Sequence, residues 1–293
     1  MVLGTSTASI GSTEEAYRRR ANDLELPSPY REPILHSPSS LVDFVQHYLD
    51  LQGPAYSVST ACSSSARVFG CAERLLRLGL ADAVLVGGTD TLCQSVLYGF
   101  NALELMSAEP CRPFDVHRQG LSLGEGAGFA ILERGSDAAV RFAGYGDASD
   151  AYHMSSPHPE GLGARLAMET ALSSAGLAPA AIDYVNLHGT ATRINDQIEG
   201  EAMRTLFAKP VASSSVKGWT GHTLGAAGIV EAVISLLCLE QGLIPETLNC
   251  REVEPRFADY VRTSSTREKL KTVMSNSFGF GGNNCSLIFG LAG

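Results

Sequence analysis

The stretch VSTACSSS, residues 58–65, decides the fold of this chain. A short strand from Tyr56 leads into it, and a helical repeat of apolar residues follows it to Leu78, so a strand turns directly into a helix with Cys62 at the junction. A continuous apolar run at 82–88 comes next and is typical of a buried strand. Strand, helix and strand in this order predict a parallel α/β unit.

The second half of the chain repeats this pattern. Its alternating apolar segments predict helices and strands at 163–175, 182–187, 197–207, 211–216 and 225–241. Each half then finishes with a glycine turn that opens a strand, GEGAGFAIL at 124–132 and GFGGNNCSLIF at 279–289. Two further helices are expected before Tyr56, at 12–22, where Ser12 and Glu15 have capping-box spacing, and at 40–50. The pattern predicts two similar α/β halves, each with a parallel sheet and a closing hairpin strand.

Composition excludes several classes of protein. With 44% hydrophobic and 18% charged residues among 293, the chain can bury a large core and is not disordered. A net charge of −9 argues against a nucleic-acid partner, because phosphate binding depends on lysine and arginine. No run reaches about 18 uninterrupted apolar residues, so no membrane span is expected. Seven cysteines without a C-x-x-C pair predict no metal site and no disulfide framework, and the N-terminus has no secretory pattern, which favours the cytoplasm.

Cys62 is the first candidate for chemistry. A thiol at the start of a helix meets the positive end of the helix dipole, which predicts a lowered pKa and a reactive thiolate. A strand-to-helix turn is also a recurrent place for a nucleophile. A small cysteine packed under a turn would have the same sequence, so this pattern leaves both readings open.

Three further segments combine polar side chains with small residues at strand ends. NLHGTAT at 186–192 releases His188 where ligands bind in open α/β sheets, although a locally hydrogen-bonded histidine would look the same. SSSVKGWTGHTLGAAG at 213–228 places Lys217 and His222 in a strand-to-helix loop, and Glu231 in the following apolar helix needs a cationic partner, for which Lys217 is the nearest candidate. NSFGFGGNN at 276–284 opens a strand and not a helix, which argues against a dinucleotide-binding loop.

Taken together and in order, these four segments resemble the elongating β-ketoacyl-acyl carrier protein synthases of types I and II, which have the thiolase fold. The resemblance implies an α/β protein of two duplicated βαβαβαββ halves, residues 1–140 and 141–293, in a five-layer αβαβα sandwich. Members of that family begin with a Val-rich strand and further helices ahead of the position of Val2, so the resemblance also implies that the N-terminal part of the first half is missing.

The resemblance implies an acyltransferase, a 3-oxoacyl-acyl carrier protein synthase. Cys62 would take the acyl chain, and the backbone N–H groups of Cys62 and Phe280 would form the oxyanion hole. His188 and His222 would stabilise the enolate formed when a malonyl unit loses carbon dioxide, and Lys217, supported by Glu231, would order them.

Further positions match substrate-binding residues of the family. Thr190 and Thr192 match residues that contact the phosphopantetheine arm, and Phe280 matches a gate over the acyl pocket, with Phe278 beside it. No cofactor beyond that carrier arm and no metal is implied.

The resemblance also implies a product and partners. A fatty-acid, polyketide or aryl-polyene chain would grow by two carbons, and SDAYHMSSPHPEG at 149–161 with the Arg193-Ile-Asn-Asp sequence looks most like the aryl-polyene branch. The partners would be an acyl carrier protein and either a second copy of the chain or a chain-length-factor subunit. The basic candidates for carrier docking are Arg18 to Arg20, Arg67, Arg74 and Arg77, although solvated helix faces explain them equally well. A non-catalytic partner subunit and a thiol hydrolase using Cys62 and His188 are the alternatives.

Overall fold

The computed structural model of the chain describes residues 1–20, 25–135 and 137–292. It contains two main sheets, the first built from residues before 134 and the second from residues after 139. The strand order in the first sheet is β2-β1-β3-β4, with bounds Tyr56–Val58, Val2–Gly4, Ala83–Asp90 and Gly126–Glu133. The order in the second is β5-β11-β10-β6-β7, with bounds Val140–Ser149, Asn283–Leu291, Thr272–Gly279, Tyr184–Asn186 and Ala212–Ser214.

Both sheets are mixed. Strands β1, β2 and β3 pair in parallel, as do β6, β7 and β10, whereas β4 pairs antiparallel with β3 and β11 forms an antiparallel hairpin with β10. An antiparallel last strand in each half agrees with the sequence prediction, although β11 does not lie at the edge of its sheet. The long strand β5, which pairs antiparallel with β11 at the edge of the second sheet, was not predicted. In the first sheet, the edge strand β4 pairs with β3 and, among the described residues, with no further strand.

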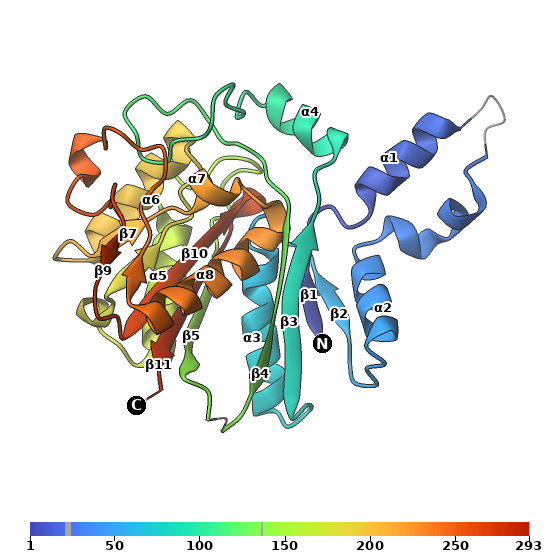
Figure 1. Cartoon of the computed structure of the whole chain (residues 1–293), viewed down its shortest axis with the longest axis horizontal. Helices are drawn as coiled ribbons and strands as arrows, with labels where there is room; N and C mark the ends of the chain where they lie inside the picture. The colour runs from blue at the N-terminus through green and yellow to red at the C-terminus, as the bar shows by residue number, and fades with distance from the viewer. Residues whose placement is uncertain (21–24, 136, 293) are drawn as a thin grey trace.

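The helices complete five layers (Figure 1). Helices α3 and α8 lie between the sheets, since each contacts strands of both. Helix α2 covers the outer side of β1 and β2, and α5, with α6 against it, covers β5 and β11. This is the predicted layer order. The helix bounds are α1 Ile10–Arg19, α2 Ser39–Tyr48, α3 Ser64–Arg77, α4 Gln94–Ala102, α5 Leu162–Ala175, α6 Arg193–Leu206, α7 Lys217–Thr220 and α8 Ala227–Gln241.

The central layer is held by close packing of α3 against α8. A Cβ on Gly228 would lie 2.4 Å from the backbone nitrogen of Ala66, so glycine allows the two helices to touch. The surrounding core is apolar, and Phe69 on α3 meets Phe289 on β11 edge to face at a centroid distance of 5.6 Å. The two halves therefore share one core.

One helical segment, Leu224–Gln241, is long and apolar enough by composition to cross a membrane, although the sequence predicted no such segment. Within it, 61% of the residues are buried, and the helix contacts α3, β4 and β10. Its place between the two sheets accounts for its apolar composition.

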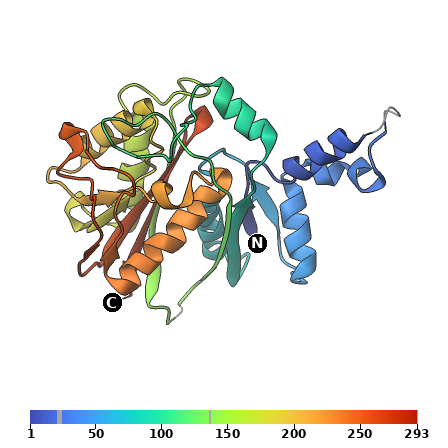
Figure 2. The same ribbon diagram turned by 45° about the horizontal axis from the view of Figure 1, so that its top comes forward.

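Two predicted details before Tyr56 differ from the structure. Helix α1 begins at Ile10, ahead of the predicted start, and Glu15 binds Arg18 and Arg19 in place of a capping box with Ser12. It ends at Arg19, and the last part of the predicted range, residues 21 and 22, lies outside the described residues. Figures 1 and 2 show α1 extending away from the side of the molecule that carries β1 and β2, while α2 lies along that side. The short hairpin of β8 (Leu243–Ile244) and β9 (Thr266–Arg267) completes the fold.

Candidate active site

Cys62 lies in the turn between β2 and α3, as the sequence predicts. Ala61 adopts a left-handed conformation with φ of 51°, and Ser64 Oγ donates to the Ala61 carbonyl and accepts from the Thr60 N–H, which pins this strained turn. The turn directs Cys62 toward the pocket, where its residue is only 6% exposed.

Burial dominates the acidity of this thiol. It raises the pKa of Cys62 to about 11, against the opposing effects of the Lys217 ammonium and of a hydrogen bond from the Phe280 backbone. The prediction of a lowered pKa is therefore wrong for this arrangement, because the loss of water around the sulfur outweighs the charges and dipoles that favour the thiolate. The backbone N–H groups of Phe280 and of Cys62 itself both act on the sulfur, so the two predicted oxyanion donors converge there.

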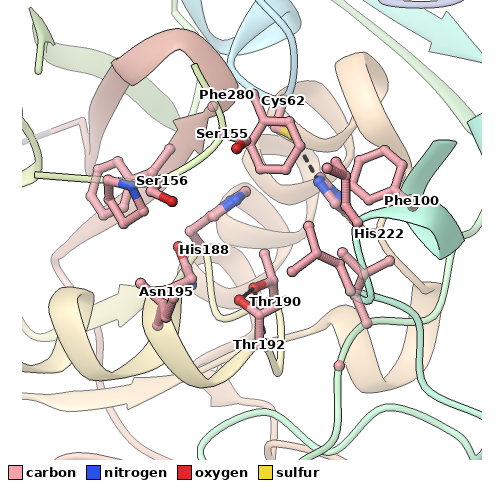
Figure 3. Close-up of a pocket in the computed structure, with 18 of the residues that line it drawn as sticks. Cys62, Phe100, Ser155, Ser156, His188, Thr190, Thr192, Asn195, His222 and Phe280 are labelled. Atoms are coloured by element: carbon pink, nitrogen blue, oxygen red, sulfur yellow. Dashed lines mark hydrogen bonds between the residues drawn. The ribbon is translucent and has the colours of Figure 1, made fainter. Parts of the chain in front are cut away.

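His222 lies against the sulfur. Its Nε2 atom is 2.9 Å from Sγ of Cys62, and the dashed line in Figure 3 marks this contact. The histidine backbone is held by the segment before β4, since its N–H donates to Ser122 and its carbonyl accepts from Gly124. A Cβ on Gly124 would lie 2.2 Å from the Thr220 carbonyl oxygen, so a glycine of the first half allows this approach by the second.

His188 follows β6 and faces His222. The two imidazole rings are 5.4 Å apart between centroids and nearly perpendicular, at 87°. Burial lowers the pKa of both histidines well below the usual value, and the nearby Lys217 ammonium lowers both further. Both rings are therefore neutral near pH 7, a state in which each has one N–H donor and one acceptor nitrogen.

Lys217 connects His188 to a buried carboxylate. Its Nζ lies 3.3 Å from Nδ1 of His188 and forms an ion pair with Glu231. The lysine is 1% and the glutamate 2% exposed, so the pair predicted from the sequence is almost fully removed from water. Because an ammonium only donates, it leaves Nδ1 of His188 as acceptor and the proton on Nε2.

Cys62, His188 and His222 open into one pocket of about 420 Å³, and Thr190, Thr192, Phe278 and Phe280 line it as well. The hydroxyls of Thr190 and Thr192 are 2.9 Å apart, and Figure 3 shows them across the pocket from Cys62. The fold therefore brings together, in one pocket, residues that were predicted from the sequence.

The two phenylalanines of the glycine turn differ in position. Phe280 stacks on Phe100 of α4 at a centroid distance of 5.5 Å and an interplanar angle of 19°. Phe278 is buried, with its ring 6.0 Å from that of His188. Phe100 was not among the predicted residues, because α4 itself was not predicted.

Sequence analysis also missed two buried acids on α6. Glu199 accepts the N–H groups of His188 and Gly189, each at 2.8 Å, and burial raises its pKa to about 7. Asp196 accepts the N–H groups of Phe114 and Ala191. These acids hold the backbone around His188, and the only sequence signal for them is a pair of carboxylates in the first two turns of a helix that follows the histidine loop.

Most of the arginines proposed for docking are engaged or distant. Arg18 and Arg19 pair with Glu15, and Arg67 pairs with Asp147. Arg74 and Arg77 lie in the last turn of α3, the opposite end of that helix from Cys62. Neither placement favours a role at the pocket mouth.

Cys62, His188 and His222 also place one sulfur and two nitrogen atoms within 4.8 Å of one another. Sulfur and imidazole nitrogen are ligands that zinc accepts, and three such ligands can leave a fourth position open. The sequence-based expectation of no metal stays a prediction.

Two family models match the chain. One, described as the beta-ketoacyl synthase N-terminal domain, matches residues 2–138, and the other, described as the beta-ketoacyl synthase C-terminal domain, matches residues 139–251.

Curated relatives agree with these models. A mitochondrial 3-oxoacyl-[acyl-carrier-protein] synthase of Arabidopsis thaliana is 40% identical over 86% of this chain and 60% of that protein. The nodulation protein E of Rhizobium meliloti (strain 1021) is 35% identical over 98% of this chain and 74% of that protein. The chain thus spans 60% of the length of the plant relative and 61% of a 3-oxoacyl-[acyl-carrier-protein] synthase 2 of Rhizobium meliloti.

Solved structures show the same fold. A solved complex of the ketosynthase ApeO with its chain length factor ApeC from Xenorhabdus doucetiae contains a chain that is 40% identical with a TM-score of 0.92, and the match covers 99% of this chain and 74% of that one. The ishigamide ketosynthase/chain length factor is 30% identical with a TM-score of 0.90 and covers 100% and 74%. These likenesses confirm the predicted thiolase-like architecture.

Proposed function

The chain belongs to the β-ketoacyl synthase family, and from that premise we propose that it catalyses the decarboxylative Claisen condensation of an acyl group on Cys62 with a malonyl thioester. The observation that supports this activity is the convergence of Cys62, His188 and His222, with Lys217 behind them, in one pocket. A nucleophile, two neutral imidazoles and two backbone N–H donors are the parts that the reaction requires.

The first step is acyl transfer to Cys62. The thiol passes its proton to Nε2 of His222 as the sulfur attacks the acyl thioester carbonyl, and the Cys62 and Phe280 N–H groups stabilise the oxyanion. The carbon–sulfur bond of the donor breaks, and the departing arm thiolate takes the proton. His222 thereby returns to its neutral form.

The second step forms the carbon–carbon bond. Malonyl thioester loses carbon dioxide, and the electron pair of the broken bond becomes an enolate whose oxygen accepts N–H bonds from His188 and His222. His188 donates from Nε2, the nitrogen that Lys217 leaves protonated. His222, neutral again after acyl transfer, exchanges its proton with solvent from Nδ1 to Nε2 and then donates from Nε2 as well. The enolate carbon attacks the acyl-Cys62 carbonyl and expels the Cys62 thiolate, which leaves a β-ketoacyl thioester two carbons longer. The thiolate then takes a proton from water and returns to the neutral thiol.

The substrate arm fits the polar side of the pocket. We assign Thr190 and Thr192 to the phosphopantetheine arm and Phe278 and Phe280 to the acyl chain, with Glu231 supporting Lys217. Residues 1–140 and 141–293 are proposed as the two halves of the fold. No cofactor beyond the carrier arm is required by this chemistry.

The partners and the pathway are likewise proposals. The complexes named above join ketosynthases to chain length factors, which supports a heterodimer, with a homodimer as the other option. A third solved relative, 25% identical, has a type II polyketide acyl-carrier protein in complex with its ketosynthase, which supports a carrier protein as the source of substrate. We assign the product to the aryl-polyene branch over the fatty-acid and other polyketide branches on the resemblance of residues 149–161, and we propose a cytoplasmic location.

Intact-protein mass after incubation with an acyl thioester tests the assignment of Cys62. We expect a stoichiometric acyl adduct that Cys62→Ala abolishes, followed on addition of malonyl thioester by carbon dioxide and a product two carbons longer. An adduct that survives Cys62→Ala would reject this nucleophile.

Two other outcomes would replace the proposed reaction. Absence of any adduct would favour a non-catalytic partner subunit. Free acid released without malonyl thioester would favour a thiol hydrolase.

A further inference from the structure

Arg193 lies where the pocket opens to solvent. Along the chain from His188, exposure rises from 2% at His188 and 6% at Thr190, through half-buried Thr192, to exposed Arg193. All four residues line the same pocket. This segment therefore forms a wall that leads from the reacting groups to the rim, with the guanidinium at its outer end.

The guanidinium is available for a ligand. Within residues 1–20, 25–135 and 137–292, no acidic side chain forms an ion pair with Arg193, and its side chain makes no hydrogen bond. Its backbone is nevertheless fixed, since its carbonyl accepts from Arg118. An unpaired arginine on a pocket rim is a notable feature in a chain of net charge −9.

In the described structure, neither of the acids that line the pocket, Glu104 and Asp150, forms an ion pair with Arg193. The Asp150 carboxylate, which also lines the pocket, accepts the N–H groups of His158 and Gly163 and the Asn284 amide. Thr192, the residue before Arg193, directs its hydroxyl to Thr190 and not to the first turn of α6. The first turn of α6 carries Asp196, which pairs with Arg118, so the attraction for an anion comes from the Arg193 guanidinium and not from the helix end.

We propose that Arg193 binds the phosphodiester of the phosphopantetheine arm at the pocket mouth, an assignment that rests on the proposed function. The arm places its thioester at Cys62 and passes the threonine hydroxyls, so its single ionised group lies at the outer end of the same wall. Arginine matches a phosphate through paired N–H donors, which threonine hydroxyls cannot supply. Arg193 thus selects donors that carry this phosphate.

Two donors that differ only in the phosphate test this role. We compare acyl-4′-phosphopantetheine with acyl-pantetheine, using the second-order rate constant for Cys62 acylation measured by intact mass. The phosphorylated donor is expected to react about tenfold faster with the unmodified protein, and Arg193→Gln is expected to bring the ratio close to one. The control Arg204→Gln, at the other end of α6 in an exposed pair with Glu201, is expected to keep the tenfold ratio.

Failure of this inference is distinguishable from failure of the proposed function. If neither donor acylates the protein, titration of 4′-phosphopantetheine and pantetheine, followed by NMR, compares their affinities for the same variants. A tenfold preference that Arg193→Gln removes supports the site even then. Equal affinities in the unmodified protein, or a preference that survives Arg193→Gln, would overturn it.

Discussion

The Nε2 atom of His222 lies 2.9 Å from the Sγ atom of Cys62, and both residues are almost fully buried. Burial raises the pKa of the thiol to about 11 and lowers the pKa of the imidazole well below its usual value. Both shifts favour a neutral thiol–imidazole pair over a thiolate–imidazolium pair. The nucleophile therefore becomes charged only as the reaction begins, with His222 in place to accept its proton.

The pH dependence of alkylation tests this neutral pair. Below its pKa, the thiolate fraction of a thiol rises tenfold per pH unit, so the rate at which iodoacetamide modifies Cys62 should rise about tenfold per unit from pH 7 to pH 10. Peptide mass spectrometry gives the rate at Cys62 alone. The Cys71→Ser variant is the suitable background, because Cys71 is only half-buried whereas the other six cysteines are buried. A plateau near pH 7 would instead indicate a preformed thiolate–imidazolium pair.

The buried ion pair of Lys217 and Glu231 should dominate stability near the site. Glu231→Leu leaves the lysine charge in an apolar interior, and we expect the free energy of unfolding to fall by about 3–5 kcal/mol. The double variant Lys217→Met/Glu231→Leu should recover most of that loss, because no charge is then left unpaired. It should not recover condensation, since Nδ1 of His188 loses its ammonium neighbour.

Urea unfolding of the single and double variants measures these values. The half-exposed pair of Arg165 and Glu169 is the matched control, and its removal should change stability by less than about 1 kcal/mol. A double variant no more stable than Glu231→Leu alone would show that packing, and not the unpaired charge, causes the loss.

Much of this arrangement was predictable because strand order determines which side chains meet. His188 lies two residues after the end of β6 and Lys217 three residues after the end of β7, and these neighbouring parallel strands end at the same edge. The partnership of Lys217 with Glu231 followed from a carboxylate in an apolar helix, which cannot stay charged alone. The local sequence pattern and the need to pair a buried charge were therefore enough to predict that these residues meet.

Other features depend on three-dimensional surroundings that a sequence pattern does not contain. The pKa of Cys62 depends on how much water the fold removes from the sulfur. The helix-dipole argument predicted a lowered pKa because the sequence does not show how deeply the sulfur is buried. Glu199 acts on backbone N–H groups, which carry no sequence signature, so its α6 position looked like an ordinary amphipathic face. Strand β5 contains Gly144 and Gly146, which allow helix α5 to approach the sheet closely but interrupt the apolar pattern that identifies a strand.

Glu199 should position His188 in a pH-dependent way. Its raised pKa means that its contribution to stability is fully present below about 4.5, the unfolded value, and is lost as the pH rises through about 7. Glu199→Gln turns an amide NH₂ toward one of the two backbone donors and should lower the free energy of unfolding at pH 5 by about 1–2 kcal/mol. Because the glutamine of the variant does not titrate, the difference in the free energy of unfolding between the variant and the unmodified chain should narrow by pH 8.

Chemical denaturation at the two pH values, with Glu201→Gln on the exposed face of the same helix as control, measures this gap. Malonyl decarboxylation supplies a second readout, which should fall in Glu199→Gln and not in the control, since only Glu199 holds the His188 backbone. If the stability difference between Glu199→Gln and the unmodified chain instead widens from pH 5 to pH 8, the ionised carboxylate is the stabilising form.

The contact between α3 and α8 should tolerate no added atom. Gly228→Ala places a methyl group 2.4 Å from the Ala66 nitrogen, which belongs to the α3 backbone and cannot rotate away, so the helices must separate at a cost of about 1–3 kcal/mol. Gly99 on α4 has no atom within 4 Å of the equivalent position in the described structure, and Gly99→Ala should stabilise by about 0.5–1 kcal/mol through helix propensity. Thermal and urea unfolding compare the two. Cys62 precedes α3, and Glu231 lies one turn beyond Gly228 on α8, so separation of the two helices should also slow the acylation of Cys62. A Gly228→Ala protein that is as stable as the unmodified chain and is acylated as fast would contradict the close approach of these helices.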